Sequence, residues 1–383
     1  MPEFRRADGR IDIKSLTLLE IEAALTGLGS ERFRALQVYK WLWQRGVREF
    51  DEMTNVAKAV RASLAERFYI PFLDVVAVQK SIDGTHKFLW ATEDGHRIES
   101  VMIPDDERNT LCVSSQVGCA MACTFCLTGD LGLRRHLKPS EIANQPLQVR
   151  QKLDEQARIS NIVMMGMGEP LHNLDNLLPA LEIYLDEQAL NFSHRKITVS
   201  TVGLVPQLQK LAEALPVNLA VSLNATTEEQ RRQVMPITRK YSMEALLAAC
   251  RDLPLKHAKR ITFEYVMMAG VNDSPADAVR LVKLMRGIKS KVNLIPYNEN
   301  PDRPTIRRPA DAVVKGFQHH LVTHGIQASV RVTRGRDISA ACGQLGKADP
   351  DKARVDEDRI QAIRIRREGE GYDASRFAFD DIV

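Results

Sequence analysis

A regular alternation of strand and helix over the middle of the chain restricts the fold more than any other feature of the sequence. Candidate strands cover 110–115, 160–165, 196–201, 217–223, 260–267, 291–296 and 328–333. Periodic apolar patterns between them predict helices over 140–152, 174–186, 204–214, 242–252, 275–287 and 310–324. This repetition predicts an α/β fold in which helical crossovers join parallel strands. Six or so such units favour a βα barrel or partial barrel over an open, doubly wound sheet.

Three regions are expected along the chain. Residues 1–75 read as a small helical accessory domain, since Thr17-x-x-Glu20 resembles a capping box and the leucines and isoleucine at 18, 21, 25 and 28 share one helical face. This domain is either an RNA-docking module or a plain helical packing unit. Residues 76–346 form the core, which begins with a β-rich stretch at 75–80, 87–91 and 96–103. Residues 347–383 are dense in both charges and predict a partly disordered tail.

Composition and cysteine usage place the protein among soluble enzymes. Hydrophobic residues make up 44% of the 383 residues and charged residues 27%, and the net charge of +4 permits a polyanionic partner without requiring one. The N-terminus does not resemble a signal peptide, and no window has the apolar length of a membrane span. A cytoplasmic location is therefore expected. Because thiols stay reduced there, the six cysteines are better read as metal, catalytic or buried thiols than as a disulfide framework.

Cys119, Cys123 and Cys126 form a C-x3-C-x2-C motif directly after the first strand of the alternating region. Three thiolates can ligate three irons of a [4Fe–4S] cluster and leave the fourth iron open to the amino and carboxylate groups of S-adenosylmethionine (SAM), whose reductive cleavage gives a 5′-deoxyadenosyl radical. The alternative is a zinc site. Structural zinc usually takes four ligands in paired sets, and no second pair lies nearby in the sequence.

The unusual residues of the core follow the predicted strands. Gly166-Met167-Gly168-Glu169-Pro170 follows the second, where glycines allow close backbone approach and the carboxylate can receive the SAM ammonium group. The series continues with Ser200-Thr201, Ser222-Leu223-Asn224, Pro296-Tyr297-Asn298 and Arg334-Gly335-Arg336-Asp337. Ligands bind at the carboxyl ends of strands in parallel α/β folds, so these segments are expected to line a single mouth.

Three segments carry a resemblance to a known family. Thr110-Leu-Cys-Val-Ser-Ser-Gln-Val-Gly-Cys119, Met164-Met-Gly-Met-Gly-Glu-Pro170 and Ala340-Ala-Cys-Gly-Gln-Leu345 closely resemble motifs of the RlmN family, in this order and spacing. These are dual-specificity radical SAM methyltransferases that modify carbon 2 of adenosine in 23S rRNA and in tRNA. The resemblance runs from about residue 10 to 346. It implies a radical SAM partial barrel, a [4Fe–4S] cluster and SAM as cofactors, and 23S rRNA and tRNA as partners.

The resemblance also implies roles for three residues. Cys342 is methylated by one SAM, a radical from a second SAM removes hydrogen from the S-methyl group, and the resulting methylene radical adds to the base. Cys112 then forms a transient disulfide with Cys342 as the product leaves. Glu99 matches the proton acceptor, although by pattern alone it is merely an exposed strand position.

The SAM contacts implied by the resemblance are Gly168, Glu169, Ser200, Ser222, Leu223, Asn224 and Asn298. Position 224 departs from the family, because many members carry His there; Asn keeps a hydrogen-bonding role but cannot titrate. Basic residues also follow the strand ends and are expected to contact phosphate. They are Arg134, Arg135, Lys138, Arg231, Arg232, Arg303, Arg307 and Arg308.

Two other functions fit part of the pattern. One is a Cfr-like adenosine carbon-8 methyltransferase of rRNA, towards which the run 127–133, with Thr128-Gly129-Asp130, leans. The other is a non-catalytic, metal-stabilised RNA-binding protein. For the leading interpretation we also expect a monomer that takes electrons from a donor such as flavodoxin or ferredoxin and has no membrane contact.

Overall fold

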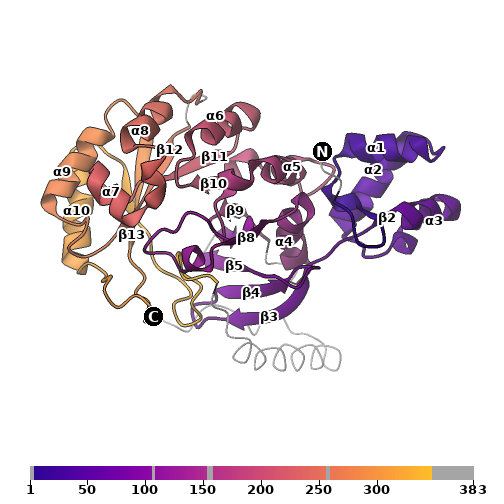
Figure 1. Cartoon of the computed structure of the whole chain (residues 1–383), viewed down its shortest axis with the longest axis horizontal. Coiled ribbons are helices and arrows are strands. Elements are labelled where there is room, and N and C mark those ends of the chain that lie inside the picture. Colours follow the sequence, from indigo (N-terminus) through magenta and orange to yellow (C-terminus); the bar gives the residue numbers. More distant parts are fainter. Residues whose placement is uncertain (1–3, 106–107, 153–157, 256–258, 347–383) are drawn as a thin grey trace, which may run out of the picture.

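A single ten-stranded sheet organises the computed structural model, which describes residues 4–105, 108–152, 158–255 and 259–346 (Figure 1). The strand order is β14-β13-β12-β11-β10-β9-β6-β5-β4-β3. The antiparallel part comprises β3 (Asp74–Lys80), β4 (His86–Ala91) and β5 (Arg97–Asp105). The parallel part comprises β6 (Arg108–Cys112), β9 (Asn161–Met164), β10 (Ile197–Thr201), β11 (Asn218–Ser222), β12 (Ile261–Met267), β13 (Ser290–Pro296) and β14 (Ala328–Val330). The predicted tail, 347–383, lies outside the described residues.

The winding of the parallel strands confirms the predicted partial barrel. From β6 to β14 each strand pairs in parallel with the next strand of the sheet, so the order along the chain is never reversed. A doubly wound sheet has such a reversal, at which its ligand site lies. The two outermost strands, β14 and β3, are not paired, so the barrel stays open.

Helices cross over between the strands, and α7, α8 and α9 begin at side-chain caps. They are α4 (Pro139–Lys152), α5 (Leu174–Leu185), α6 (Val205–Ala214), α7 (Glu228–Val234), α8 (Met243–Asp252), α9 (Pro275–Leu284) and α10 (Asp311–Thr323). At the start of α9, Ser274 and Asp277 form a capping box, and Pro275 occupies the first helical position. The short helix α7 was missed by the sequence analysis. The other six predicted helices are present with small shifts at their ends.

The N-terminal region is helical, as predicted, and includes a strand pair that was not predicted. Its helices are α1 (Leu18–Gly27), α2 (Phe33–Lys40) and α3 (Lys58–Arg67), and β1 (Ile11–Asp12) pairs with β2 (Phe68–Tyr69). The Thr17–Glu20 capping box is confirmed. Figure 1 shows these helices gathered at one end of the molecule, beside α4 and α5.

Buried polar contacts attach the N-terminal region to α4. Lys14 Nζ donates to Asn144 Oδ1 at 2.8 Å, and the Ser140 hydroxyl donates to Asp12 Oδ2 at 2.5 Å. All four side chains are fully buried or nearly so. These contacts stabilise one orientation of α4. The domain boundaries at 75 and 346 stay predictions. So does the choice between an RNA-docking module and a packing unit for the N-terminal region.

Candidate active site

A cavity at the carboxyl ends of the parallel strands brings most of the predicted site residues together. It encloses about 950 Å³, including the open solvent at its mouth. The predicted residues that line it are Cys119, Cys123, Cys126, Gly168, Glu169, Ser200, Ser222, Asn224, Asn298 and Cys342. Its size and mixed lining suit a cofactor larger than a single metal ion. We call it the cluster cavity.

The loop that carries the three cysteines is fixed by backbone contacts. It lies between β7 (Gln116–Gly118) and β8 (Leu133–His136), and the Cys119 amide donates to the carbonyl of Gly132 at 3.0 Å. Gly118 has φ +76°, and a Cβ atom there would overlap the Gly132 carbonyl oxygen, so only glycine fits. The loop therefore holds its thiols in place through its own fold.

Arg303 is a functional residue whose role at this loop the sequence analysis missed. Its guanidinium donates to the carbonyl of Thr124, to the carbonyl of Cys126 at 2.9 Å and to Asp130 Oδ1 at 2.6 Å. Arg303 therefore clamps the cysteine loop, and its predicted phosphate contact stays a prediction. Arg231 is likewise buried, and donates to the carbonyls of Val202 and Ser222 at the ends of β10 and β11.

The three cysteines suit a cluster better than a single ion. Burial raises the pKa of the Cys119 thiol to about 12, and it also raises the pKa of Cys123 and Cys126, so these thiols become thiolates on binding metal. Within the described ranges, no three His, Cys, Asp or Glu side chains converge on one ion. The three thiols line one cavity whose size exceeds that of a single metal ion, so the donor set fits a three-ligated cluster.

Glu169 is the buried carboxylate of the cluster cavity. Its Oε1 accepts the Leu171 amide at 3.1 Å and its Oε2 accepts the Val202 amide at 2.9 Å, which leaves further lone pairs for an ammonium group. Burial outweighs these hydrogen bonds and raises its pKa to about 7. The neighbouring glycines serve close packing within the protein: a Cβ on Gly168 would lie 2.6 Å from the Gln116 side chain.

The side chains of Asn224 and Leu223 make their contacts within the protein. Asn224 adopts a left-handed backbone with φ 57°, which Asn tolerates better than most residues, and its Oδ1 accepts the Val266 amide at 2.8 Å. Its Nδ2 donates to Met235 Sδ at 3.3 Å. Leu223 is fully buried and does not line the cavity, so only its backbone could serve a ligand. SAM contacts at both positions stay predictions.

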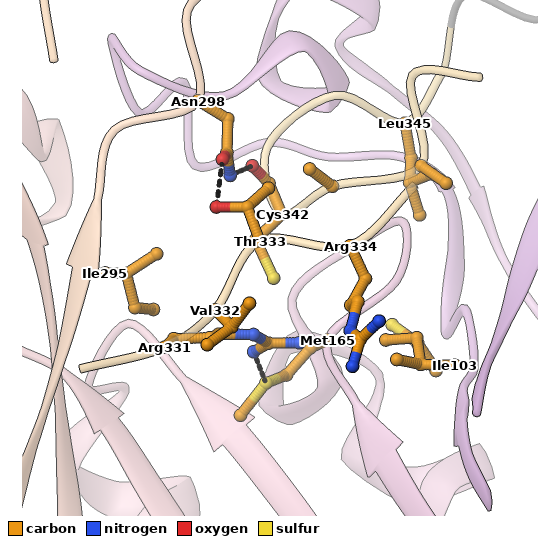
Figure 2. Close-up of a pocket in the computed structure, with 13 residues that line it drawn as sticks. Ile103, Met165, Ile295, Asn298, Arg331, Val332, Thr333, Arg334, Cys342 and Leu345 are labelled. Carbon is orange, nitrogen blue, oxygen red and sulfur yellow. Dashed lines mark hydrogen bonds between the residues drawn. The ribbon is translucent and has the colours of Figure 1, made fainter. Parts of the chain in front are cut away.

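A second pocket, adjoining the first, holds Cys112 and Cys342. It is lined also by Met165, Asn298 and Arg331, and Figure 2 shows the Cys342 side chain pointing into it, towards Arg331 and Met165. We call it the thiol pocket. Cys342 lines both cavities, and Asn298 holds its backbone by donating from Nδ2 to the Cys342 carbonyl at 3.3 Å.

The two thiols of this pocket interact electrostatically with one buried cation. Burial, and then proximity to Cys342, raises the pKa of the Cys112 thiol to about 12, while Arg331 opposes the rise. Cys342 is the largest influence that raises the pKa of Arg331, and Glu264 on β12 adds to it. All six cysteines, each within the described ranges, are free thiols, so the expected Cys112–Cys342 disulfide is absent from this structure.

Glu99 does not occupy the exposed strand position that its pattern suggests. It lies on β5 with 1% of its surface exposed, and its Oε2 accepts the Gly346 amide at 2.5 Å. Lys87 on β4 lies 3.4 Å from its Oε1. Glu99 lines neither cavity and instead contacts the chain segment that carries Cys342.

Comparison with known proteins decides the family. The radical SAM superfamily matches residues 113–282, and the ribosomal RNA large subunit methyltransferase N-terminal domain matches residues 11–70. The dual-specificity RNA methyltransferase RlmN of Pelobacter propionicus is 52% identical over 342 residues, which are 89% of this chain and 97% of that protein. The chain belongs to the RlmN family. The corresponding protein of Geobacter sulfurreducens is 51% identical over 343 residues, 89% of this chain and 94% of its own.

A solved structure agrees with this membership. The crystal structure of a radical SAM methyltransferase from Sphaerobacter thermophilus is 43% identical, superposes with a TM-score of 0.82, and covers 87% of this chain and 98% of its own. The protein is therefore a radical SAM methyltransferase, and its family uses a [4Fe–4S] cluster and SAM. Membership in an enzyme family excludes the non-catalytic RNA-binding alternative. Within the part of the chain that the structure describes, no helix could span a membrane.

Proposed function

We propose that this chain methylates carbon 2 of adenosine in 23S rRNA and in tRNA, with Cys342 as the carrier of the methyl carbon. The observation that supports this most is the position of Cys342, which lines both the cluster cavity and the thiol pocket. Relatives about 50% identical over most of the chain are named dual-specificity RNA methyltransferases. Carbon 2 of adenine is not nucleophilic, so a protein thiol that carries the carbon meets a chemical need.

Each site residue has a role under this proposal. The bound cofactors supply a 5′-deoxyadenosyl radical, and Cys119, Cys123 and Cys126 hold the cluster. Glu169 receives the SAM ammonium group, and Ser200, Ser222 and Asn298 orient the rest of the molecule. Cys342 accepts the methyl group and presents it to the base. Cys112 attacks the Cys342 sulfur when the product leaves, and Glu99 accepts a proton once the segment that covers it has moved.

The experiment that tests the proposal is mass mapping of the modified base. Anaerobically reconstituted protein is incubated with SAM, a reductant and 23S rRNA or tRNA that lacks the modification, and the digested nucleosides are fragmented. We expect 2-methyladenosine in both RNAs. A product methylated at carbon 8 would identify the Cfr-like activity instead, and a reduced protein that leaves SAM intact would contradict both.

Residues 127–133, which resemble the carbon-8 enzyme, make local contacts in this structure. Asp130 accepts from Arg303 at 2.6 Å, and the Thr128 hydroxyl donates to the Leu345 carbonyl at 2.8 Å. These contacts fix the cysteine loop and the segment that carries Cys342. They favour neither carbon, so the family relationship supports carbon 2.

Three further properties belong to the same proposal. The free thiols suit the reducing cytoplasm. The cluster needs one electron at low potential, which flavodoxin or ferredoxin can supply. We propose that the protein acts as a monomer, and sedimentation at working concentration tests this: a dimer would contradict it.

A further inference from the structure

The segment that carries Cys342 contains no helix or strand, yet it occupies a defined place. We call residues 335–346 the Cys342 strap. Ala340, Ala341, Gln344 and Leu345 are buried, while the backbone forms only turns and bends. Without a ladder of its own hydrogen bonds, the strap takes its position from contacts with other parts of the fold.

The part of the strap before Cys342 is bound to the β3–β4 hairpin. Asp337 Oδ1 accepts the Ser81 hydroxyl at 2.5 Å, and its Oδ2 accepts the Ile82 amide at 3.1 Å. The Gly335 amide donates to Asp83 Oδ2 at 2.8 Å. Burial opposes the ionisation of Asp83, but hydrogen bonds led by the Gly335 amide outweigh it and lower its pKa to about 2. The hairpin therefore presents an ionised carboxylate, that of Asp83, to the strap at neutral pH.

Lys87, on the same hairpin, makes a third contact before Cys342. Its ammonium donates to the Ser339 carbonyl at 3.5 Å and lies 3.4 Å from Glu99 Oε1. The side chains of Lys87 and Glu99 are only 4% and 2% exposed, so each compensates the buried charge of the other. Lys87 thus links the strap to the two strands beneath it.

The part of the strap after Cys342 is bound to the cysteine loop and to Glu99 on β5. The Leu127 amide donates to the Gly343 carbonyl at 2.8 Å, and the Thr128 hydroxyl donates to the Leu345 carbonyl at 2.8 Å. The Gly346 amide donates to Glu99 Oε2 at 2.5 Å. Cys342 therefore lies between two sets of anchors, one on the hairpin and one beside the cluster ligands.

We infer that Asp337 and Lys87 are positioning residues, through which the β3–β4 hairpin sets where the Cys342 sulfur lies between the cluster cavity and the thiol pocket. The inference rests on the proposed function of Cys342 as methyl carrier. In the first step a methyl group passes from the SAM sulfonium to the Cys342 sulfur, leaving S-adenosylhomocysteine, and the thiol proton goes to solvent. The displacement needs the sulfur, and the later removal of hydrogen needs the methyl carbon that the sulfur carries, within about 3–3.5 Å of the reaction partner. A misplacement of about 1 Å can cost a hundredfold in rate.

The arrangement predicts a specific defect when the hairpin anchors are removed. The cysteine loop keeps its own contacts, so cluster assembly and SAM binding persist. The Cys342 sulfur samples more positions, so a smaller fraction of Cys342 becomes methylated. More 5′-deoxyadenosyl radical is then consumed without forming methylated adenosine. A variant that was merely unstable would instead lose iron, SAM binding and methylation together.

The test compares Asp337→Ala, Ser81→Ala and the double variant with Asp252→Ala, which alters an exposed aspartate of α8. Peptide mass analysis gives the S-methylated fraction of Cys342, and chromatography gives 5′-deoxyadenosine per methylated adenosine. We expect the methylated fraction to fall, and the 5′-deoxyadenosine ratio to rise, about tenfold in Asp337→Ala with unchanged iron content. Because Ser81 and Asp337 share one contact, the double variant should be little worse than Asp337→Ala. Hydrogen exchange of the peptide covering the strap should accelerate in the same variants.

The role of Lys87 is tested by replacing both Lys87 and Glu99, because Lys87→Met alone leaves the buried Glu99 carboxylate without its partner. Lys87→Met with Glu99→Gln removes both charges, and Lys87→Arg keeps the cation. We expect the double variant to under-methylate Cys342, a step that precedes any role of Glu99, and Lys87→Arg to retain most of the methylation. Lys210→Met, at an exposed lysine of α6, is the matched control.

The outcomes separate the inference from the proposed function. If the native protein forms neither S-methylcysteine nor methylated adenosine, the proposed function is wrong and the inference falls with it. If the native protein forms both, and the Asp337 and Lys87 variants match it in methylated fraction and product ratio, only the positioning role is overturned. A parallel loss of iron and methylation in every variant would also overturn it.

Discussion

The two groups of functional cysteines reach their places by different means. Cys119, Cys123 and Cys126 lie within eight residues of one loop, held by the Gly132 carbonyl and the Arg303 guanidinium. Cys112 and Cys342 lie at opposite ends of the core sequence and share a pocket because β6 and the Cys342 strap meet there. Local spacing therefore determines cluster ligation, whereas topology determines which thiols can carry the methyl carbon.

The largest effect is expected from the local group. Cys123→Ala removes one of three cluster ligands, so iron and sulfide content, the cluster absorption and SAM cleavage should fall below a few per cent of native. Cys250→Ala is a matched control, because Cys250 is a buried cysteine of α8 that lines neither cavity. It should keep the cluster and lose about 1 kcal/mol of stability. Equal loss of iron in both variants would contradict a specific role of Cys123 in cluster ligation.

Removal of one thiol of the distant pair should stop a later step only. Cys112→Ala leaves the cluster loop intact, so Cys342 should be methylated and RNA should accumulate in covalent linkage to it. Denaturing electrophoresis and the mass of the adduct measure this. The double variant Cys112→Ala with Cys342→Ala should form no adduct. Normal turnover by Cys112→Ala would rule out the disulfide step.

A smaller effect is expected from a change at Glu169, which belongs to a local sequence motif and lines the cluster cavity. Glu169→Gln keeps the size of the side chain but removes the charge that receives the SAM ammonium group. A hydrogen bond between charged groups contributes about 1.5–3 kcal/mol, so SAM affinity should fall about ten- to a hundredfold, measured by equilibrium binding. Glu182→Gln, at an exposed position of α5 outside both cavities, should leave the affinity for SAM unchanged. An unchanged affinity in Glu169→Gln would remove this carboxylate from the SAM site.

A long-range contact that supports the Cys112 side is expected to affect the free energy of unfolding and its dependence on pH. Lys14 holds Asn144 on α4, and the next residue, Gln145, accepts the Ser114 amide at 2.8 Å just after Cys112. Burial lowers the pKa of Lys14 to about 7 from 10.5, so between these values the unfolded chain binds more protons than the folded one. The native protein should therefore gain stability over Lys14→Met as pH rises from 7 to 10, by up to about 1.4 kcal/mol per pH unit. Urea unfolding at several pH values measures the difference, and a constant difference would show that Lys14 is not buried as a neutral amine.

The sequence was sufficient for features that depend on neighbours along the chain. Strand and helix periods predicted the partial barrel, and the strand-end rule placed Glu169, Ser200 and Ser222 in one cavity. It could not predict contacts between distant segments. Nothing near Glu99 indicates that Lys87 and Gly346 bury it, and nothing near Arg303 indicates that it clamps the cysteine loop. The predicted strand 328–333 also ends early, at Val330, and Arg331, which follows it, lines the thiol pocket.

Gly118, the residue before the first cluster ligand, has a consequence for the inheritance of this site. Its left-handed backbone and the Gly132 carbonyl leave no room for a side chain. In a screen of all single substitutions, position 118 should tolerate change as poorly as Cys119, although glycine contributes no chemistry of its own. A lineage could alter the RNA it recognises many times over while this residue stays unchanged.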